Sequence, residues 1–221
     1  MKKFFATGLI FLFVFVSLYS QDAGKISLGA RGGLQIGIGK IQDDFKEQLR
    51  FNECKDEAWP SGNLVLYGAF GITNKIGLQT ELNFMINQGK VGRLESNPSY
   101  YIKVTYTSLD IPVLLKVNFL DSQARFGILG GPNFTFPLGK ASTKYEGFIN
   151  TDTKHDYDAP NLGFVVGLYG GPAFMKGRWV IDVRYVQDSG ISTIKKWLNG
   201  IDIEFMHRRA IAITLGLEFF L

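Results

Sequence analysis

The sequence predicts an all-β fold, an eight-stranded antiparallel up-and-down β-barrel that spans a membrane. Three observations lead to this prediction. From Ile26 onward, apolar residues recur at every second position, which is the period of a β-strand. Short turns alternate with long polar segments between the predicted strands, as they do in barrels with two unlike ends. An apolar N-terminal segment of the secretory type precedes the first strand.

The N-terminal segment has the order of a signal peptide. Lys2 and Lys3 precede an apolar run from Phe4 to about Val16, and the segment continues to Ser20. A membrane-spanning anchor is the alternative, but the run is shorter than the roughly 20 residues that a helix needs to cross hydrocarbon. We therefore expect residues 1–20 to be removed and residues 21–221 to form a single barrel domain.

The C-terminal segment shows the strand pattern most clearly. Ile211 and Leu215 fall on one face with the other large apolar residues, whereas Thr214, Gly216 and Glu218 fall on the opposite face. A helix would mix these two sets. The segment 210–221 is therefore a predicted strand, and the same sorting predicts seven more, at residues 26–38, 62–72, 76–87, 101–119, 124–136, 161–174 and 178–187.

The connections between the predicted strands alternate in length. Tight turns rich in Asn, Asp, Ser and Gly are expected at residues 73–75, 120–123 and 175–177. Long polar segments lie at about residues 39–61, 88–100, 137–160 and 189–204, and the first of them could hold a short helix at 41–50. We expect both termini and the tight turns in the periplasm and the four long loops outside.

The polar face of the strands carries few charges, and this decides which face is outside. A water-facing surface usually carries roughly 25–35% charged residues, whereas this face is rich in Gly and Ala. On the apolar face, Lys103 is expected above the lipid. The apolar face therefore meets lipid, and a closed barrel satisfies every backbone group there. Seven charges are predicted in the lumen: Arg31, Glu81, Asp110, Lys116, Asp182, Arg184 and Glu218.

These lumen charges are expected to be structural. The lumen of an eight-stranded barrel is just wide enough for side chains to fill, and an unpaired buried charge is costly. We expect Asp182 to pair with Arg184 and Glu81 with Arg31. The sequence thus predicts an ion-paired core and not an open pore.

A glycine-rich motif occurs twice, as GILGGPNF at residues 127–134 and as GLYGGPAF at residues 167–174. A phosphate-binding loop is disfavoured because no Gly-Lys-Ser/Thr follows and neither copy opens a helix. In the strand alternation, the first and third glycines of each copy point into the lumen: Gly127, Gly131, Gly167 and Gly171. Proline cannot donate to the ladder, so Pro132 and Pro172 should each mark a bulge or a non-bonded position.

The run YTSLDIPVLLKVNF at residues 106–119 resembles a segment of the PorT-like and OmpX-like outer-membrane β-barrel family of diderm bacteria. The segment 77–82 followed by Gly89, and the segment 182–185 followed by Gly190, are similar to two further elements of that family. The resemblance implies the outer membrane as location, and the family's namesake is associated with protein export. Gly216, Phe219 and Leu221 are similar to the signal read by the barrel assembly machinery, although the last residue is Leu where Phe is usual.

We expect no catalytic, cofactor or metal site. A cation could bind Lys144, Asp152, His155, Asp156 and Asp158, but acidic loops are usually only solvated. A lipid-A-modifying hydrolase could use Glu204 and His207 with Ser189 or Ser192, but a solvated loop histidine is the favoured reading. Trp59, Trp179 and Trp197 are expected in aromatic belts. A net charge of +4 without a basic and aromatic cluster gives no reason to expect nucleic acid.

The expected function is non-enzymatic. The loops would contact other cell-surface or secretion components, and the expected partners are outer-membrane lipid, lipopolysaccharide or its equivalent, the barrel assembly machinery and a surface protein. Two alternatives stay open: a narrow porin-like channel, and a small hydrophobic-ligand transporter that opens laterally at Pro132 or Pro172. The hydrolase is the least favoured.

Overall fold

The computed structural model describes residues 24–38, 58–91, 101–119, 124–146, 152–158, 162–174, 176–188, 192–194, 203–205 and 209–221. No helix in this part of the chain is long and apolar enough to cross a membrane. The described strands are β1 (Ile26–Ile38), β2 (Ala58–Gly71), β3 (Ile76–Val91), β4 (Tyr101–Asn118), β5 (Ala124–Glu146), β6 (Asp152–His155), β7 (Tyr157–Asp158), β8 (Gly163–Phe174), β9 (Gly177–Asp188), β10 (Ser192–Ile194), β11 (Ile203–Phe205) and β12 (Arg209–Phe220).

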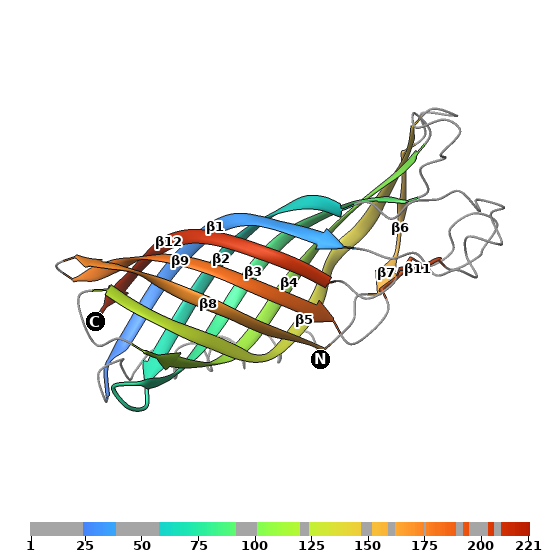
Figure 1. The fold of residues 1–221 in the computed structure, drawn as a ribbon. Coiled ribbons are helices and arrows are strands. Elements are labelled where there is room, and N and C mark those ends of the chain that lie inside the picture. The colour runs from blue at the N-terminus through green and yellow to red at the C-terminus, as the bar shows by residue number, and fades with distance from the viewer. Residues whose placement is uncertain are drawn as a thin grey trace.

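Eight long strands close the barrel in the order β1, β2, β3, β4, β5, β8, β9 and β12 (Figure 1). Each pairs antiparallel with its neighbours, and β12 returns to pair with β1. The predicted eight-stranded up-and-down antiparallel barrel is confirmed. We call the end with the turn at 72–75 and the C-terminal residue the turn end, because Leu221 and Gly71 lie beside the start of β1 there. The opposite end is the loop end.

The large apolar side chains of the barrel strands point outward, as the alternation predicts. Leu34, Leu64, Leu168 and Ile213 are each more than half exposed, and their lipid-facing neighbours show the same pattern. Two residues expected on this face are instead covered, Ile26 at 6% and Ile111 at 8% exposure. The band of outward apolar side chains is what a hydrocarbon environment requires of a spanning barrel.

The prediction of residues 137–160 as an irregular loop is wrong. β5 continues to Glu146, and β6 pairs with its residues 141–144. Short strands also occupy the other predicted long loop, where β10 pairs with both β11 and β7. The apolar alternation stops where lipid contact stops, but the hydrogen-bonded ladder needs no apolar face to continue. Apolar periodicity therefore underestimates the length of strands that continue beyond the membrane.

One register shift is present along the long β4–β5 hairpin. The pairing passes from Thr105↔Ser142 to Thr107↔Leu138, so β5 contributes extra residues there. Gly139 lies in this bulge with a φ of 80°, a conformation that favours glycine. A bulge increases the local twist, and it lies where the hairpin leaves the barrel (Figure 1).

The two copies of the glycine motif make room for different neighbours. A Cβ on Gly127 would lie 2.7 Å from the Tyr169 hydroxyl, and one on Gly167 would lie 2.8 Å from Cγ of Arg184. The first glycine of each copy therefore seats a lumen side chain. A Cβ on Gly131 or Gly171 would lie 2.0 Å from a backbone carbonyl of the next strand. The third glycine of each copy therefore allows close approach of two backbones.

The prolines of the motif mark non-bonded positions and not bulges. The β4–β5 register passes from Pro112↔Asn133 to Leu115↔Gly130 without a change of offset, so Pro132 and Gly131 are unpaired on this side. The β8–β9 register likewise passes from Gly170↔Ile181 to Ala173↔Arg178 around Pro172. On its other side, each proline strand stays paired in register. The missing N–H of proline accounts for an interrupted ladder on one side.

Alanine at Gly131 or Gly171 should destabilise the barrel by about 1–3 kcal/mol, because the added methyl group overlaps a backbone carbonyl that cannot move away alone. Gly62→Ala is the matched control, since a Cβ there meets nothing within 4 Å, and should stay within about 0.5 kcal/mol. Urea unfolding in lipid vesicles, followed by tryptophan fluorescence, measures the difference. Equal stability of all three variants would contradict the close-approach explanation.

Candidate functional site

Nine charged side chains of the described residues are buried in the barrel interior. The structure places all seven sequence-predicted lumen residues there, each at most 6% exposed. It adds two charges at the ends of β9, Arg178 and Asp188, both also buried. The sequence carried a signal for Arg178. This residue lies an even number of positions from Asp182 and Arg184 on the same strand, so its side chain faces the same side. Asp188 lies one residue beyond the predicted strand end.

Four of these charges form a closed ring, which we call the ion-pair ring: Arg31, Glu81, Asp182 and Arg184. Arg31 Nη2 lies 2.7 Å from Glu81 Oε1, and Arg31 Nη1 lies 2.8 Å from Asp182 Oδ2. Arg184 binds the same two carboxylates, with Nη1 2.7 Å from Glu81 Oε2 and Nε 2.5 Å from Asp182 Oδ1. The ring joins β1, β3 and β9 across the lumen. Both expected pairs, Arg31 with Glu81 and Arg184 with Asp182, are present, and each arginine binds both carboxylates.

Two neighbouring side chains add further contacts to the ring, whereas Arg31 Nε has no hydrogen-bond partner among the described residues. Glu81 also accepts a hydrogen bond from Gln79 Nε2, and the Arg31 guanidinium lies 4.6 Å from the centroid of the Tyr67 ring. The hydrogen bonds between the arginines and the carboxylates of the ring are charge-assisted, and such bonds are roughly twice as strong as neutral ones. Small residues oppose the ring on neighbouring strands, with Gly167 and Ala212 directly opposite Arg184. The narrow lumen thus has space for two guanidinium groups.

A second charged layer lies on the turn side of the ring, around Glu218. Arg178 Nε donates to Glu218 Oε2 at 2.6 Å, and the Ser27 hydroxyl donates to Glu218 Oε1. Lys116 Nζ lies 3.9 Å from the same carboxylate and 4.4 Å from the centroid of the Tyr169 ring. The Tyr169 hydroxyl donates to Asn118 Oδ1. These contacts lie in the interior between the ring and the turn end.

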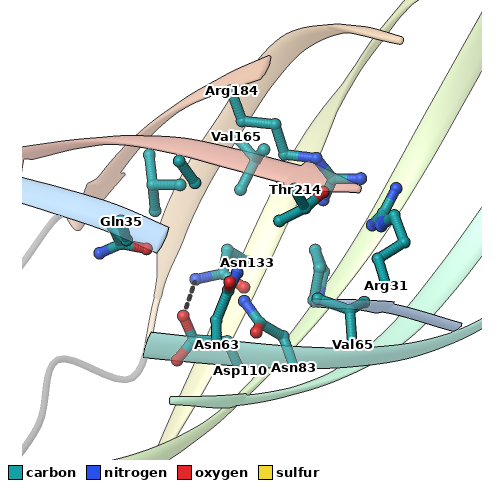
Figure 2. Close-up of a pocket in the computed structure, with 13 residues that line it drawn as sticks. Arg31, Gln35, Asn63, Val65, Asn83, Asp110, Asn133, Val165, Arg184 and Thr214 are labelled. Carbon is teal, nitrogen blue, oxygen red and sulfur yellow. Dashed lines mark hydrogen bonds between the residues drawn. The ribbon is translucent and has the colours of Figure 1, made fainter. Parts of the chain in front are cut away.

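A cavity lies on the loop side of the ring (Figure 2). About 340 Å³ of space not filled by atoms lies within and in front of it, and this volume includes open solvent. Arg31 and Arg184 belong to its lining, together with polar side chains further toward the loop end. Among those, Asn133 Nδ2 donates to Asp110 Oδ2 at 3.4 Å and to Thr135 Oγ1 at 3.3 Å. Asp110 is thus placed in the cavity wall and not in the ring.

The residues of the proposed assembly signal lie at the turn end of β12. Gly216 faces inward, and a Cβ there would lie 2.0 Å from the Ala30 carbonyl oxygen. Phe219 points outward and meets Phe174 edge-on, with ring centroids 6.2 Å apart. The Leu221 amide donates to the Ile26 carbonyl at 3.0 Å, which joins the end of β12 to the start of β1.

The alternative loop sites are only partly within the described structure. Asp156 pairs with exposed Lys140 at 3.3 Å, and no group of three or more His, Cys, Asp or Glu side chains within the described ranges could hold a metal. Ser192 and Glu204 fall on the paired strands β10 and β11, whereas His207 and Ser189 lie outside the described residues. Trp179 is half exposed on the lipid face; Trp197 and the 41–50 segment are outside the described ranges.

Replacing Glu81 by Gln should destabilise the barrel by about 3–5 kcal/mol, because two buried arginines then share one remaining carboxylate. Lys140→Ala removes the exposed pair with Asp156, where an ion pair contributes roughly 0–1 kcal/mol. Urea unfolding in vesicles compares the two. A Glu81→Gln variant as stable as Lys140→Ala would contradict the buried ring.

Comparison with known proteins agrees with this architecture. No curated protein matches the chain. Among solved structures, OprG from Pseudomonas aeruginosa has a TM-score of 0.57 at 14% identity over 91% of this chain and 98% of that chain. The outer membrane protease OmpT from Escherichia coli (TM-score 0.49, 9% identity, 92% and 98% covered) and Ail from Yersinia pestis (0.43, 13%, 88% and 98%) are also similar. At 14% identity the likeness to OprG shows the fold alone. The model of the outer membrane protein beta-barrel domain family matches residues 17–195, and the chain belongs to that family.

Proposed function

We propose that this outer-membrane barrel is a non-enzymatic surface protein that contacts other cell-surface or secretion components. The observation that carries the proposal is an ordered sheet that projects beyond the barrel at its loop end (Figure 1). We call it the projecting sheet; it consists of the loop-end parts of β3, β4 and β5 together with β6. A barrel needs no such extension to span the membrane.

The projecting sheet is built from regular strand pairing. β3 pairs with β4 up to Val91↔Ile102, and β4 pairs with β5 up to Tyr101↔Glu146. β6 adds a further strand along residues 141–144 of β5. Nearby, β7 and β10 join the segments that follow β5 and β9, since Ile194 pairs with Tyr157. Such paired backbone presents a defined surface to a partner and supports recognition by shape.

The two charged layers across the lumen support a contact role over a channel. The ion-pair ring crosses the interior at mid-barrel, and the layer around Glu218 follows on the turn side. A solute crossing the barrel would have to separate both sets of buried charges. We therefore assign the contacts with a partner to the projecting sheet.

We also propose a narrower family, an orientation in the membrane and an assembly signal for this barrel. The resemblance of residues 106–119 favours a PorT-like or OmpX-like member of the family, with both termini and the turn end in the periplasm. Gly216, Phe219 and Leu221 would then be read by the barrel assembly machinery. The loop end would face the cell exterior, with lipopolysaccharide or its equivalent around the barrel.

A lateral path for a hydrophobic ligand is the second candidate, favoured by the interrupted ladders. The β4–β5 interruption at Pro132 lies beside Pro112 and Asn133, which both line the cavity. A strand pair without hydrogen bonds opens at lower cost than a paired one. One measurement distinguishes the two candidate functions. Only the lateral path predicts faster entry of a hydrophobic probe into vesicles that contain the protein.

Replacing residues 139–158 by a short Gly–Ser turn should abolish contact with the surface partner while the barrel still folds, because the described residues of this range lie beyond the apolar band. Crosslinking on intact cells followed by purification of the barrel measures partner capture. Gly62→Ala, which leaves the projecting sheet unchanged, is the control and should capture the partner as the wild type does.

Folding of each variant is checked by the difference in gel migration between boiled and unboiled samples. Equal capture by the shortened variant would contradict a role for the projecting sheet. Steady conductance of the wild-type protein in planar lipid bilayers would also contradict the proposal and would favour the narrow channel.

A further inference from the structure

The unpartnered buried polar atoms of the cavity on the loop side of the ion-pair ring are mostly oxygens, beside one donor, Arg31 Nε. Five buried oxygen atoms of its lining accept no hydrogen bond from any described residue. They are Gln35 Oε1, Asn63 Oδ1, Asn83 Oδ1, Asn133 Oδ1 and Thr214 Oγ1. Four of the five are carboxamide oxygens, which only accept hydrogen bonds. A buried acceptor without a partner costs about 1–3 kcal/mol, so five around one cavity indicate a missing electropositive group.

The hydrogen bonds of Asn133 determine which of its atoms faces the cavity. Its Nδ2 donates to Asp110 Oδ2 and to Thr135 Oγ1, so both of its donors are committed within the wall. Its Oδ1 is therefore the atom left for a ligand. Asn83 lies directly opposite Asp110 on the neighbouring strand. Figure 2 shows Asn63, Asn83, Asp110 and Asn133 gathered in one corner of the cavity.

The charges of the lining also favour a positive ligand. Arg31 and Arg184 are neutralised by Glu81 and Asp182 within the ring. Among the thirteen lining residues, the third formal charge is the negative one of Asp110, whose Oδ2 accepts a hydrogen bond from Asn133. Gln35, Asp110 and Asn133 are each at most 2% exposed, so the low dielectric around them strengthens any attraction to a cation.

From these contacts we propose that the cavity binds one hard cation, calcium, through the carboxamide oxygens of Asn63, Asn83 and Asn133 and the carboxylate of Asp110. Calcium takes six to eight oxygen ligands in flexible geometry and accepts amide oxygens and waters among them. Magnesium gives up its waters reluctantly and prefers an octahedron of smaller radius. Gln35 and Thr214 supply further oxygens from the opposite strands.

The number of carboxylates sets the expected affinity. One carboxylate among neutral oxygens places calcium binding in the weak range, with a Kd of about 10⁻⁴–10⁻³ M. Such a site is occupied at extracellular calcium concentrations and empties when calcium is removed. The site does not depend on the proposed surface role, because none of its residues belongs to the projecting sheet.

Calorimetric titration of the purified barrel with calcium chloride, at constant ionic strength in a neutral detergent, tests the proposal. We expect saturable binding with one calcium per barrel, and binding at least tenfold weaker for magnesium chloride and sodium chloride. The melting temperature should rise with calcium over the same concentrations, because a ligand that binds only the folded state stabilises it.

Four variants locate the site. Asp110→Asn should abolish calcium binding, and Asn83→Asp should tighten it about tenfold by adding a second carboxylate directly opposite Asp110. The double variant Asp110→Asn with Asn83→Asp moves the single carboxylate across one strand pair and should restore wild-type affinity. Asn87→Asp is the matched control, since Asn87 is also buried on β3 but binds Ser108 and does not line the cavity.

Absence of saturable binding would overturn the proposal and would mean that water satisfies the five oxygens. Binding that is unchanged in both single cavity variants would also overturn it, because calcium would then sit on exposed acidic residues. If Asp110→Asn fails to fold, as judged by its gel migration without boiling, Asn83→Asp and Asn87→Asp decide: equal affinity of these two contradicts the site.

Discussion

The ion-pair ring of Arg31, Glu81, Asp182 and Arg184 is the constraint on which the rest of the interior depends. A barrel in lipid can place charge only inside, and a charge buried there is costly until it is paired. Two guanidinium groups and two carboxylates at 2.5–2.8 Å meet that requirement together, since each group binds two of opposite sign. Removal of one member would leave two others short of a partner.

The ring also explains the small residues of the inner face. Gly167 must lack a side chain for Arg184 to lie where it does, and Gly127 must lack one for Tyr169, which in turn covers Lys116. The repeated glycine motif therefore serves the packing of the lumen, and its third glycine lets neighbouring backbones approach. The ring separates the filled layer around Glu218 from the oxygen-lined cavity, so the two halves of the lumen have different chemistry.

Much of this architecture follows from the sequence, because a period of two fixes the face of every residue once the outward face is known. The lumen positions of Arg31, Glu81 and Glu218 are of this kind. Periodicity does not give the height of a residue in the barrel, because height depends on the register between strands. The membership of the ring, the place of Asp110 in the cavity wall and the pairing of Arg178 with Glu218 all depend on that register. Apolar periodicity does not predict the projecting sheet for another reason. The strands of this sheet lack the apolar face by which a strand within lipid is recognised.

The ring acts as one unit, and a thermodynamic cycle over its two carboxylates is the decisive measurement of this property. Glu81 and Asp182 share both arginines, so neutralising the first carboxylate also relieves the repulsion between the two, and neutralising the second does not. The double variant Glu81→Gln with Asp182→Asn should therefore lose more unfolding free energy than the sum of the single variants, by about 0.5–3 kcal/mol. Losses that add within about 0.5 kcal/mol would show two independent pairs and would contradict the account.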